Sequence, residues 1–253
     1  MLVVAFFLNQ TYRGLHVGRY PNRFLDQSLL KVRVLHWLNY LYDMDGYLHW
    51  GLNHFAGENP YTQQAISKGL PLGDRAIVYP GKKGLLGSLR FSAMRDGLQD
   101  FEYLWTLENE LSKIKKKVGK EAFWLDPRQR PLELCRRAVW SFYEYTREPD
   151  VMLNTRNAIA REIEELQAEP LLIVQTSPPE GTVVPAGPRN IGVRGIVQPG
   201  AKVTLNGRPV QNVRPSGYFL QAHFMSENNP TITITVEHNG KKRTVRRTFK
   251  LTD

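Results

Sequence analysis

Residues 1–8 read MLVVAFFL, an unbroken apolar run that opens the strand–helix–strand pattern on which the fold prediction depends. Such a run is typical of a strand buried on both faces of a parallel sheet. A helix of about four turns is predicted next, with Asp26 as its N-cap and a broad apolar face up to Leu41. Asp45-Gly46 then turns the chain into a second predicted strand at residues 47–52. This order predicts a βαβ unit of a parallel sheet.

A long loop is predicted for residues 53–87, where Gly and Pro are frequent and no periodicity is visible. Ser88 is the expected N-cap of the next helix, whose apolar positions continue to the lysine-rich stretch near Lys115. Two further helices are predicted at residues 131–146 and 150–167. These elements make the first two thirds of the chain an α/β region with trailing helices.

From Pro170 onward, short alternating runs predict an all-β domain. Strands are expected at residues 203–205, 218–220 and 232–236. Turn dipeptides separate the strands: Pro199-Gly200, Asn206-Gly207, Ser216-Gly217 and Asn239-Gly240. Six or seven strands in about 80 residues are typical of an immunoglobulin-like β-sandwich. The predicted organisation is therefore an α/β part at residues 1–118, a helical extension at 119–169 and a sandwich at 170–253.

The net charge of +10 favours a polyanionic partner, either nucleic acid or an acidic polysaccharide. However, the basic residues cluster in three separate segments, at residues 113–117, 128–137 and 241–247. None is interleaved with aromatic residues as in a single-strand binder, so a solvated surface is the favoured interpretation and nucleic acid is not an expected partner. The single cysteine, Cys135, excludes an intrachain disulfide.

The apolar start of the chain is not typical of a signal peptide, because no basic residues precede it and no small-residue cleavage site follows it. It is also too short to span a membrane. The His, Cys and carboxylate residues show no spacing of a metal site, and no cofactor is expected.

Several sequence blocks resemble one enzyme family when taken in series. They are NRFLD (22–26), LHWLN (35–39), GYLHWGLN (46–53), GD (73–74), IVYPG (77–81), SLR (88–90) and MRDGLQDFEYL (94–104). In this order and spacing they resemble the C-terminal part of the glycoside hydrolase family 123-like catalytic module, also called domain of unknown function 4091. The resemblance covers about residues 1–110. Residues 178–253 resemble, more loosely, the immunoglobulin-like modules of bacterial enzymes.

The resemblance implies a (β/α)8 barrel whose seventh and eighth strands are residues 2–8 and 47–52. It also implies hydrolysis of β-linked N-acetylhexosaminides by a substrate-assisted mechanism, in which an adjacent Asp-Glu pair orients the substrate's acetamido group and protonates the leaving group. No adjacent Asp-Glu pair occurs in the 253 residues. The chain is therefore expected to be a C-terminal fragment, inactive alone, of a secreted or periplasmic parent. Its expected partners are an N-acetylhexosamine-containing glycan and the remaining half of the barrel. The alternative is a non-catalytic carbohydrate-binding or scaffold protein.

Five residues are predicted to contact a glycan: Trp50, Asn53, Asp74, Tyr79 and Arg90. Trp50 lies near the end of the last predicted strand, where barrel active sites are found, and its indole could stack on a sugar ring. The alternative for Trp50 is core packing. Asn53, Asp74 and Tyr79 follow in the loop, where turn formation is the alternative. Arg90 lies in the first turn of the next helix, where an ion pair with a neighbouring carboxylate is favoured.

Other polar residues are interpreted as structural. Alternation along a strand would place His49 on the face opposite to Trp50, as a buried histidine. Arg95, Asp96, Asp100 and Glu102 are helix-spaced, which favours a salt-bridge network over a catalytic carboxylate pair. Asp43 and Asp45 precede the last predicted strand and so lie at the wrong end of a barrel for catalysis.

Overall fold

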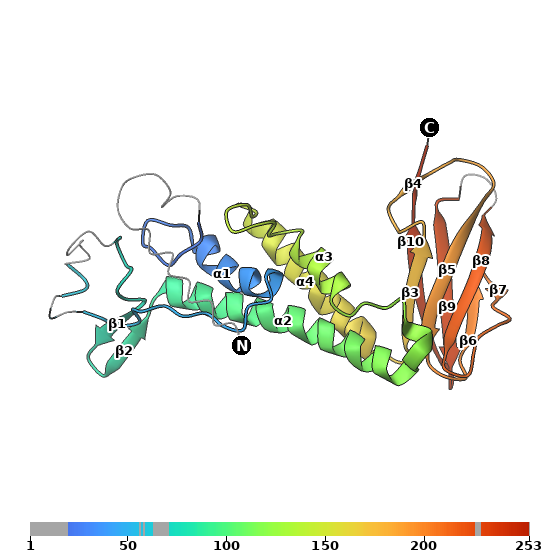
Figure 1. Cartoon of the computed structure of the whole chain (residues 1–253), viewed down its shortest axis with the longest axis horizontal. Coiled ribbons are helices and arrows are strands. Elements are labelled where there is room, and N and C mark those ends of the chain that lie inside the picture. Colours follow the sequence, from blue (N-terminus) through green and yellow to red (C-terminus); the bar gives the residue numbers. More distant parts are fainter. Residues whose placement is uncertain (1–19, 56, 58, 63–70, 226–228, 253) are drawn as a thin grey trace. The chain divides into compact units, whose positions relative to one another are not determined.

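The computed structural model describes residues 20–55, 57, 59–62, 71–225 and 229–252 (Figure 1). The chain divides into two compact units. The first, here called the helical unit, comprises Met1–Glu108 and Arg128–Ala160, and the second, the sheet unit, comprises Asn109–Pro127 and Arg161–Asp253. The expected strand at residues 2–8 lies outside the described residues.

Within the described residues, four α-helices contribute to the helical unit: α1 (Leu29–Leu41), α2 (Leu89–Val118), α3 (Gln129–Cys135) and α4 (Pro149–Gln167). Their fully buried side chains include Trp37, Leu104, Leu134 and Ile159, one from each helix. The C-terminal parts of α2 and α4, after Glu108 and Ala160, belong to the sheet unit. The approach of α1 to α2 is close, because a Cβ atom added to Gly97 would lie 2.4 Å from the carbonyl oxygen of Arg33. The predicted helix at residues 150–167 is confirmed as α4.

The N-terminus of α2 is also confirmed. Ser88 Oγ accepts a hydrogen bond from the Phe91 N–H at 3.2 Å, which satisfies one of the free donors of the first turn. The loop predicted before it is partly wrong, because residues 78–87 form a hairpin. Strands β1 (Val78–Gly81) and β2 (Gly84–Gly87) pair antiparallel.

The predicted strand at residues 47–52 is wrong: this segment forms no strand and bends at Trp50 and Leu52. Its carbonyl groups accept hydrogen bonds from groups outside any sheet. The Arg23 guanidinium donates to the Gly51 carbonyl, and the Ile77 N–H donates to the Leu52 carbonyl at 2.9 Å. An isolated antiparallel bridge then joins Asn53 to Ala76. The segment therefore pairs with residues 75–77, and not with a parallel neighbour.

Two helix boundaries also differ from the prediction. Helix α1 begins after Ser28, so Asp26 is not its N-cap. Helix α3 ends at Cys135 where the pattern predicted a helix to residue 146. The chain reverses there, because the Thr146 N–H donates to the Ala138 carbonyl at 2.7 Å and Val139 bridges Tyr145. These non-local backbone bonds replace the helical ones.

The described part of the sheet unit contains a 3-10 helix, η2 (Gly119–Ala122), and nine strands. One antiparallel sheet has the order β3-β5-β8, a second has the order β10-β9-β6-β7, and β11 pairs parallel with β4. The strand bounds are β3 Leu172–Ser177, β4 Val183–Val184, β5 Arg189–Val197, β6 Lys202–Leu205, β7 Arg208–Pro209, β8 Tyr218–Met225, β9 Thr231–His238, β10 Lys241–Thr248 and β11 Lys250–Leu251.

Alternate residues of these strands form one core that includes Val193, Val203, Phe219 and Ile234. The three predicted strands are confirmed as parts of β6, β8 and β9. The Asn-Gly turns are confirmed as well. Both residues of Asn206-Gly207 and of Asn239-Gly240 have positive φ, as a type I′ hairpin turn requires. Whether the unit is immunoglobulin-like stays a prediction.

Candidate functional site

Asp74 is the centre of a polar cluster in the helical unit. Its carboxylate accepts a hydrogen bond from Trp50 Nε1 at 2.9 Å, and its other oxygen lies 3.2 Å from His49 Nε2. Asp74 is buried, with 7% of its surface exposed. The structure thus brings together two of the predicted site residues, Trp50 and Asp74, and adds His49 to them.

His49 was expected on the opposite side from Trp50, and that expectation is wrong. Alternation applies only to a strand, and this segment is not one. The Nδ1 atom of His49 faces Arg23 Nη2 and the Gly51 N–H, both of which are donors. Nδ1 is therefore the acceptor, and Nε2 carries the proton that is donated to Asp74. With both ring nitrogens engaged, His49 is oriented by Arg23 and Gly51 and holds the Asp74 carboxylate in place.

The charge of Asp74 is stabilised by its neighbours. Burial raises the pKa of its carboxyl group, but hydrogen bonds from His49 and Trp50 and the positive charge of Arg23 outweigh burial and hold the pKa below its usual value. Asp74 is therefore ionised at neutral pH and accepts strong hydrogen bonds from the indole and the imidazole.

Trp50 is the exposed member of the cluster. Its N–H is tied to Asp74, while 48% of the residue remains exposed. His49 lies nearly parallel to it, with ring centroids 6.4 Å apart, and His54 packs edge-on at 5.6 Å. The indole is thus anchored at its polar edge, with accessible apolar surface. Such an arrangement could support the apolar face of a ring-shaped ligand.

Arg90 lies beneath this surface and is buried. Its guanidinium donates to the carbonyls of Arg23, Gly73 and Ala76 and to the Tyr79 hydroxyl, the last at 2.8 Å. The structure thus places it among carbonyl groups, where sequence reasoning favoured an ion pair. Arg90 joins Tyr79 to the segment that carries Asp74.

Asn53 and Tyr79 flank the cluster. The Asn53 backbone bridges Ala76, and its side chain is exposed. Tyr79 lies 5.5 Å from the Tyr61 ring, centroid to centroid. Sequence reasoning missed Arg23, which is 2% exposed and links His49, Gly51 and the Asp74 carbonyl. Arg23 lies in the NRFLD block (22–26), but its spacing shows no partner, since its partners lie 26 to 51 positions away.

Asp96 and Asp100 of α2 form ion pairs, in agreement with the sequence interpretation of these two residues. Asp100 is fully buried and accepts bonds from Arg33 at 2.6 and 2.9 Å and from Trp37 Nε1 at 2.8 Å. Asp96 pairs with its exposed neighbour Arg95. Asp43 pairs with Arg128 at 2.7 Å.

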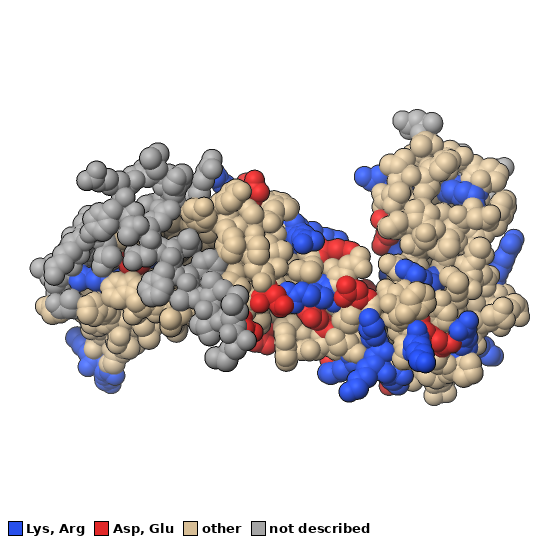
Figure 2. Space-filling model, viewed as in Figure 1, with Lys and Arg blue, Asp and Glu red and all other residues tan. Residues whose placement is uncertain are grey.

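Members of all three basic clusters form ion pairs, including Lys113, Arg128, Arg130, Lys241 and Arg247. In Figure 2, acidic side chains lie among the basic ones on the visible face. Within the described ranges, no group of three or more His, Cys, Asp or Glu residues is arranged to hold a metal ion. None of the helices described is long and apolar enough to cross a membrane.

Residues 10–107 match the family described as Glycoside hydrolase 123, catalytic domain. This match confirms the resemblance over those residues, which include every predicted site residue. No curated protein matches the chain. The crystal structure of an engineered protein from the Northeast Structural Genomics Consortium aligns with 89% of this chain and 60% of its own, at 16% identity. Its TM-score of 0.22 is too low to indicate a shared fold.

Proposed function

We propose that this chain supplies glycan-binding surface of a glycoside hydrolase related to family 123, with Trp50 as the sugar platform. The observation that carries the proposal is the half-exposed indole whose N–H is anchored by the buried Asp74 carboxylate. Anchoring fixes the orientation of the ring before a ligand arrives, which lowers the entropic cost of binding. The family match over residues 10–107 supports a carbohydrate as the ligand.

The proposed substrate class is a β-linked N-acetylhexosaminide, hydrolysed by the complete enzyme with assistance from the substrate's acetamido group. This chain has no adjacent Asp-Glu pair, so the acid and the orienting carboxylate would come from other sequence. Asn53 and Tyr79 are proposed to supply hydrogen bonds at the edge of the platform. Asp74 and Arg90 are proposed to support it from below, since both are buried.

The proposed architecture follows from the same relation. Residues 1–118 would belong to the C-terminal portion of a (β/α)8 barrel, residues 119–169 to a helical extension, and residues 170–253 to an immunoglobulin-like sandwich. The family match supports the first assignment. Two antiparallel sheets around one core support the last.

Replacing Trp50 with Ala tests the platform. Binding of N-acetylgalactosamine is measured by calorimetric titration. We expect at least about tenfold weaker binding in Trp50→Ala, because the stacking surface is removed. Asp74→Asn is expected to weaken binding less, since the indole remains but loses its charged anchor. Trp140→Ala is the matched control, because Trp140 is exposed to a similar extent, 53%. Equal affinities of wild type and Trp50→Ala would contradict the proposal.

A non-catalytic carbohydrate-binding protein is the second candidate. It is favoured by the exposed, anchored indole of Trp50, which offers binding surface, in a sequence that has no adjacent Asp-Glu pair. The two candidates differ in one assay. Under the hydrolase proposal, a chromogenic β-N-acetylgalactosaminide is cleaved when the chain is joined to a segment that carries the Asp-Glu pair. Under the alternative, the joined protein binds the sugar and releases no chromophore.

A further inference from the structure

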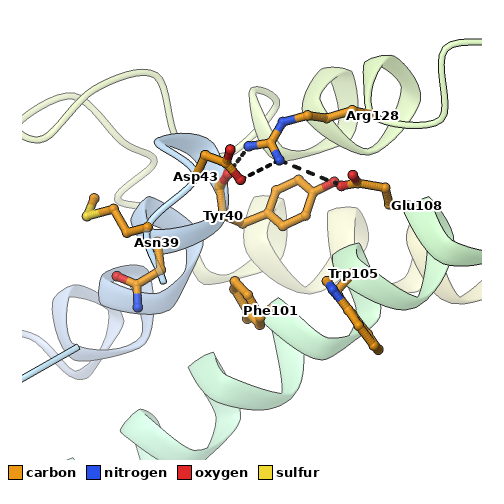
Figure 3. A pocket seen from close by; sticks show the side chains of 8 residues that line it. Asn39, Tyr40, Asp43, Phe101, Trp105, Glu108 and Arg128 are labelled. Carbon is orange, nitrogen blue, oxygen red and sulfur yellow. Dashed lines mark hydrogen bonds and ion pairs between the residues drawn. The ribbon is translucent and has the colours of Figure 1, made fainter. Parts of the chain in front are cut away.

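A pocket lies in the helical unit, between the C-terminal end of α1 and the middle of α2 (Figure 3). Its volume is about 120 Å³. That is several times the space that one buried water needs, so it offers room for a ring-sized ligand. Its walls are formed by Asn39, Tyr40, Asp43, Met44, Phe101, Trp105, Glu108 and Arg128.

The polar groups of this pocket carry both signs of charge. Arg128 lies 2.7 Å from Asp43 and 3.9 Å from Glu108. The Tyr40 hydroxyl donates to Glu108 at 2.5 Å. Burial and this hydrogen bond raise the pKa of Tyr40 above its ordinary value, so the phenol stays neutral and remains a donor. Acceptor and donor groups are thus paired with one another before any ligand binds.

The apolar side of the pocket is aromatic. Phe101 packs edge-on against Tyr40, with ring centroids 6.0 Å apart. Trp105, one helical turn further along α2, is 52% exposed. A half-exposed indole beside planar polar groups offers an apolar face and hydrogen bonds at its rim.

Asn39 adds an independent observation. The residue is 6% exposed and lines the pocket, and its Oδ1 atom has no hydrogen-bond partner among the described residues. A buried amide oxygen without a partner is costly, unless a water or a ligand group donates to it. The Oδ1 atom itself is enclosed by protein, so Asn39 contributes to the wall of the pocket.

The charges decide which ligand class fits. A cationic ligand would meet Arg128, and an anionic ligand would meet Asp43 and Glu108. A neutral polyhydroxylated ring meets neither repulsion, because each hydroxyl can both donate to a carboxylate and accept from a guanidinium. Its C–H face could lie against the Trp105 indole. We propose that this pocket is a second carbohydrate subsite, which takes a single neutral pyranose ring between Trp105 and the Glu108–Arg128 pair.

This subsite is distinct from the Asp74 cluster and does not depend on it. Trp105 follows Arg90 by fifteen positions in α2, which corresponds to about 22 Å along a helix axis. The two sites share no described residue, so each can bind or fail to bind by itself.

One titration tests both sites separately. The chain has five Trp residues, whose ¹⁵N-labelled indole N–H signals can be followed by NMR and assigned with single Trp→Phe variants. Galactose, glucose and N-acetylgalactosamine are added singly to wild type and to Trp50→Ala. Saturable movement of the Trp105 signal in both proteins is the expected result. Movement of the Trp50 signal alone would support the Asp74 platform and overturn the second subsite.

Substitutions of Glu108 test the subsite while Trp105 is retained, so its indole signal still reports sugar binding. Glu108→Ala is expected to weaken the sugar's effect on the Trp105 signal at least about tenfold, while Glu108→Gln, which still accepts from Tyr40, is expected to lose less. Thermal melting checks that both variants fold. Unchanged affinity in a folded Glu108→Ala would overturn the proposal. So would a Trp105 signal that responds to tetramethylammonium or acetate and not to any sugar, since the pocket would then select charge.

Discussion

Single buried side chains in the helical unit show how the environment selects a protonation state. Asp74 is buried but keeps its charge, because three neighbours stabilise the carboxylate. His36 is buried to a similar extent, 2% exposed, and its Nε2 atom has no hydrogen-bond partner within the described part of the chain. Its nearest aromatic neighbour is Tyr47, packed edge-on at 5.5 Å. Without a counter-charge, burial lowers the pKa of His36 to about 4.

The stability of the helical unit is therefore expected to depend on pH through His36. The unfolded chain binds this proton below about pH 6.5, whereas the folded chain binds it only below about pH 4. Stability is fully present above pH 6.5 and falls by about 3 kcal/mol as the pH drops to 4. In His36→Phe this fall should be largely absent, as measured by urea unfolding between pH 4 and 7.5. An unchanged slope in the variant would contradict the assignment to His36.

Helices α1, α2 and α4 are joined by one carboxylate. Asp100 of α2 accepts bonds from Arg33 and Trp37 of α1 and lies 3.3 Å from Arg156 of α4. Arg156 also lies over the Tyr103 ring, 4.9 Å from its centroid. Because Asp100 is fully buried, its charge is compensated only by these partners. The helices thus depend on a polar contact as well as on apolar packing.

Removing this charge is expected to destabilise the helical unit strongly. In Asp100→Asn, two arginines would face a neutral amide, and breaking a buried pair typically costs about 3–5 kcal/mol. Asp96→Asn is the matched control, four positions earlier in the same helix. Its pair with Arg95 is exposed, so its loss should cost less than about 1 kcal/mol. Unfolding in guanidinium measures the free energy of unfolding of both variants. Equal losses in the two variants would show that Asp100 does not hold the three helices together.

At the scale of the whole molecule, the sheet unit has an apolar core of its own. The core of the sheet unit is built from residues between Leu172 and Leu251. Residues 109–127 add contacts to it, because Glu121 accepts bonds from Arg214 and Ser216, and Arg194 lies 4.9 Å from the Trp124 ring centroid. These are contacts at the surface, and the apolar core does not include them. The strands thus contain their own core.

A fragment of residues 168–253 is therefore expected to fold by itself. It should melt cooperatively, at a lower temperature than the same unit in the full chain, because the contacts with Glu121 and Trp124 are lost. Circular dichroism and ¹⁵N NMR spectra measure this, with Val236→Asp as the control that should abolish folding. A disordered spectrum of the unsubstituted fragment would contradict the expectation.

Local signals in the sequence were sufficient for a large part of this fold. The start of α2 at Ser88, the span of α4 and the strands and Asn-Gly turns of the sheet unit could all be predicted. In each case the deciding hydrogen bonds or apolar contacts connect residues a few positions apart, or neighbouring strands that alternate in the same way. Trp50 and Asp74 were predicted to contact a glycan from their expected positions at the barrel mouth, and that role stays a prediction; both lie within the residues that match the family.

The path of residues 47–54 was decided only by the tertiary structure. An apolar segment becomes a strand only when another strand pairs with it, and here its partners are the Arg23 side chain and the backbone of residues 75–77. That path turns His49 toward Asp74 and anchors the Trp50 indole. Sequence could therefore single out Trp50, Asp74 and Arg90, whereas the placement of His49 and Arg23 beside them depends on contacts between residues that are distant in the chain.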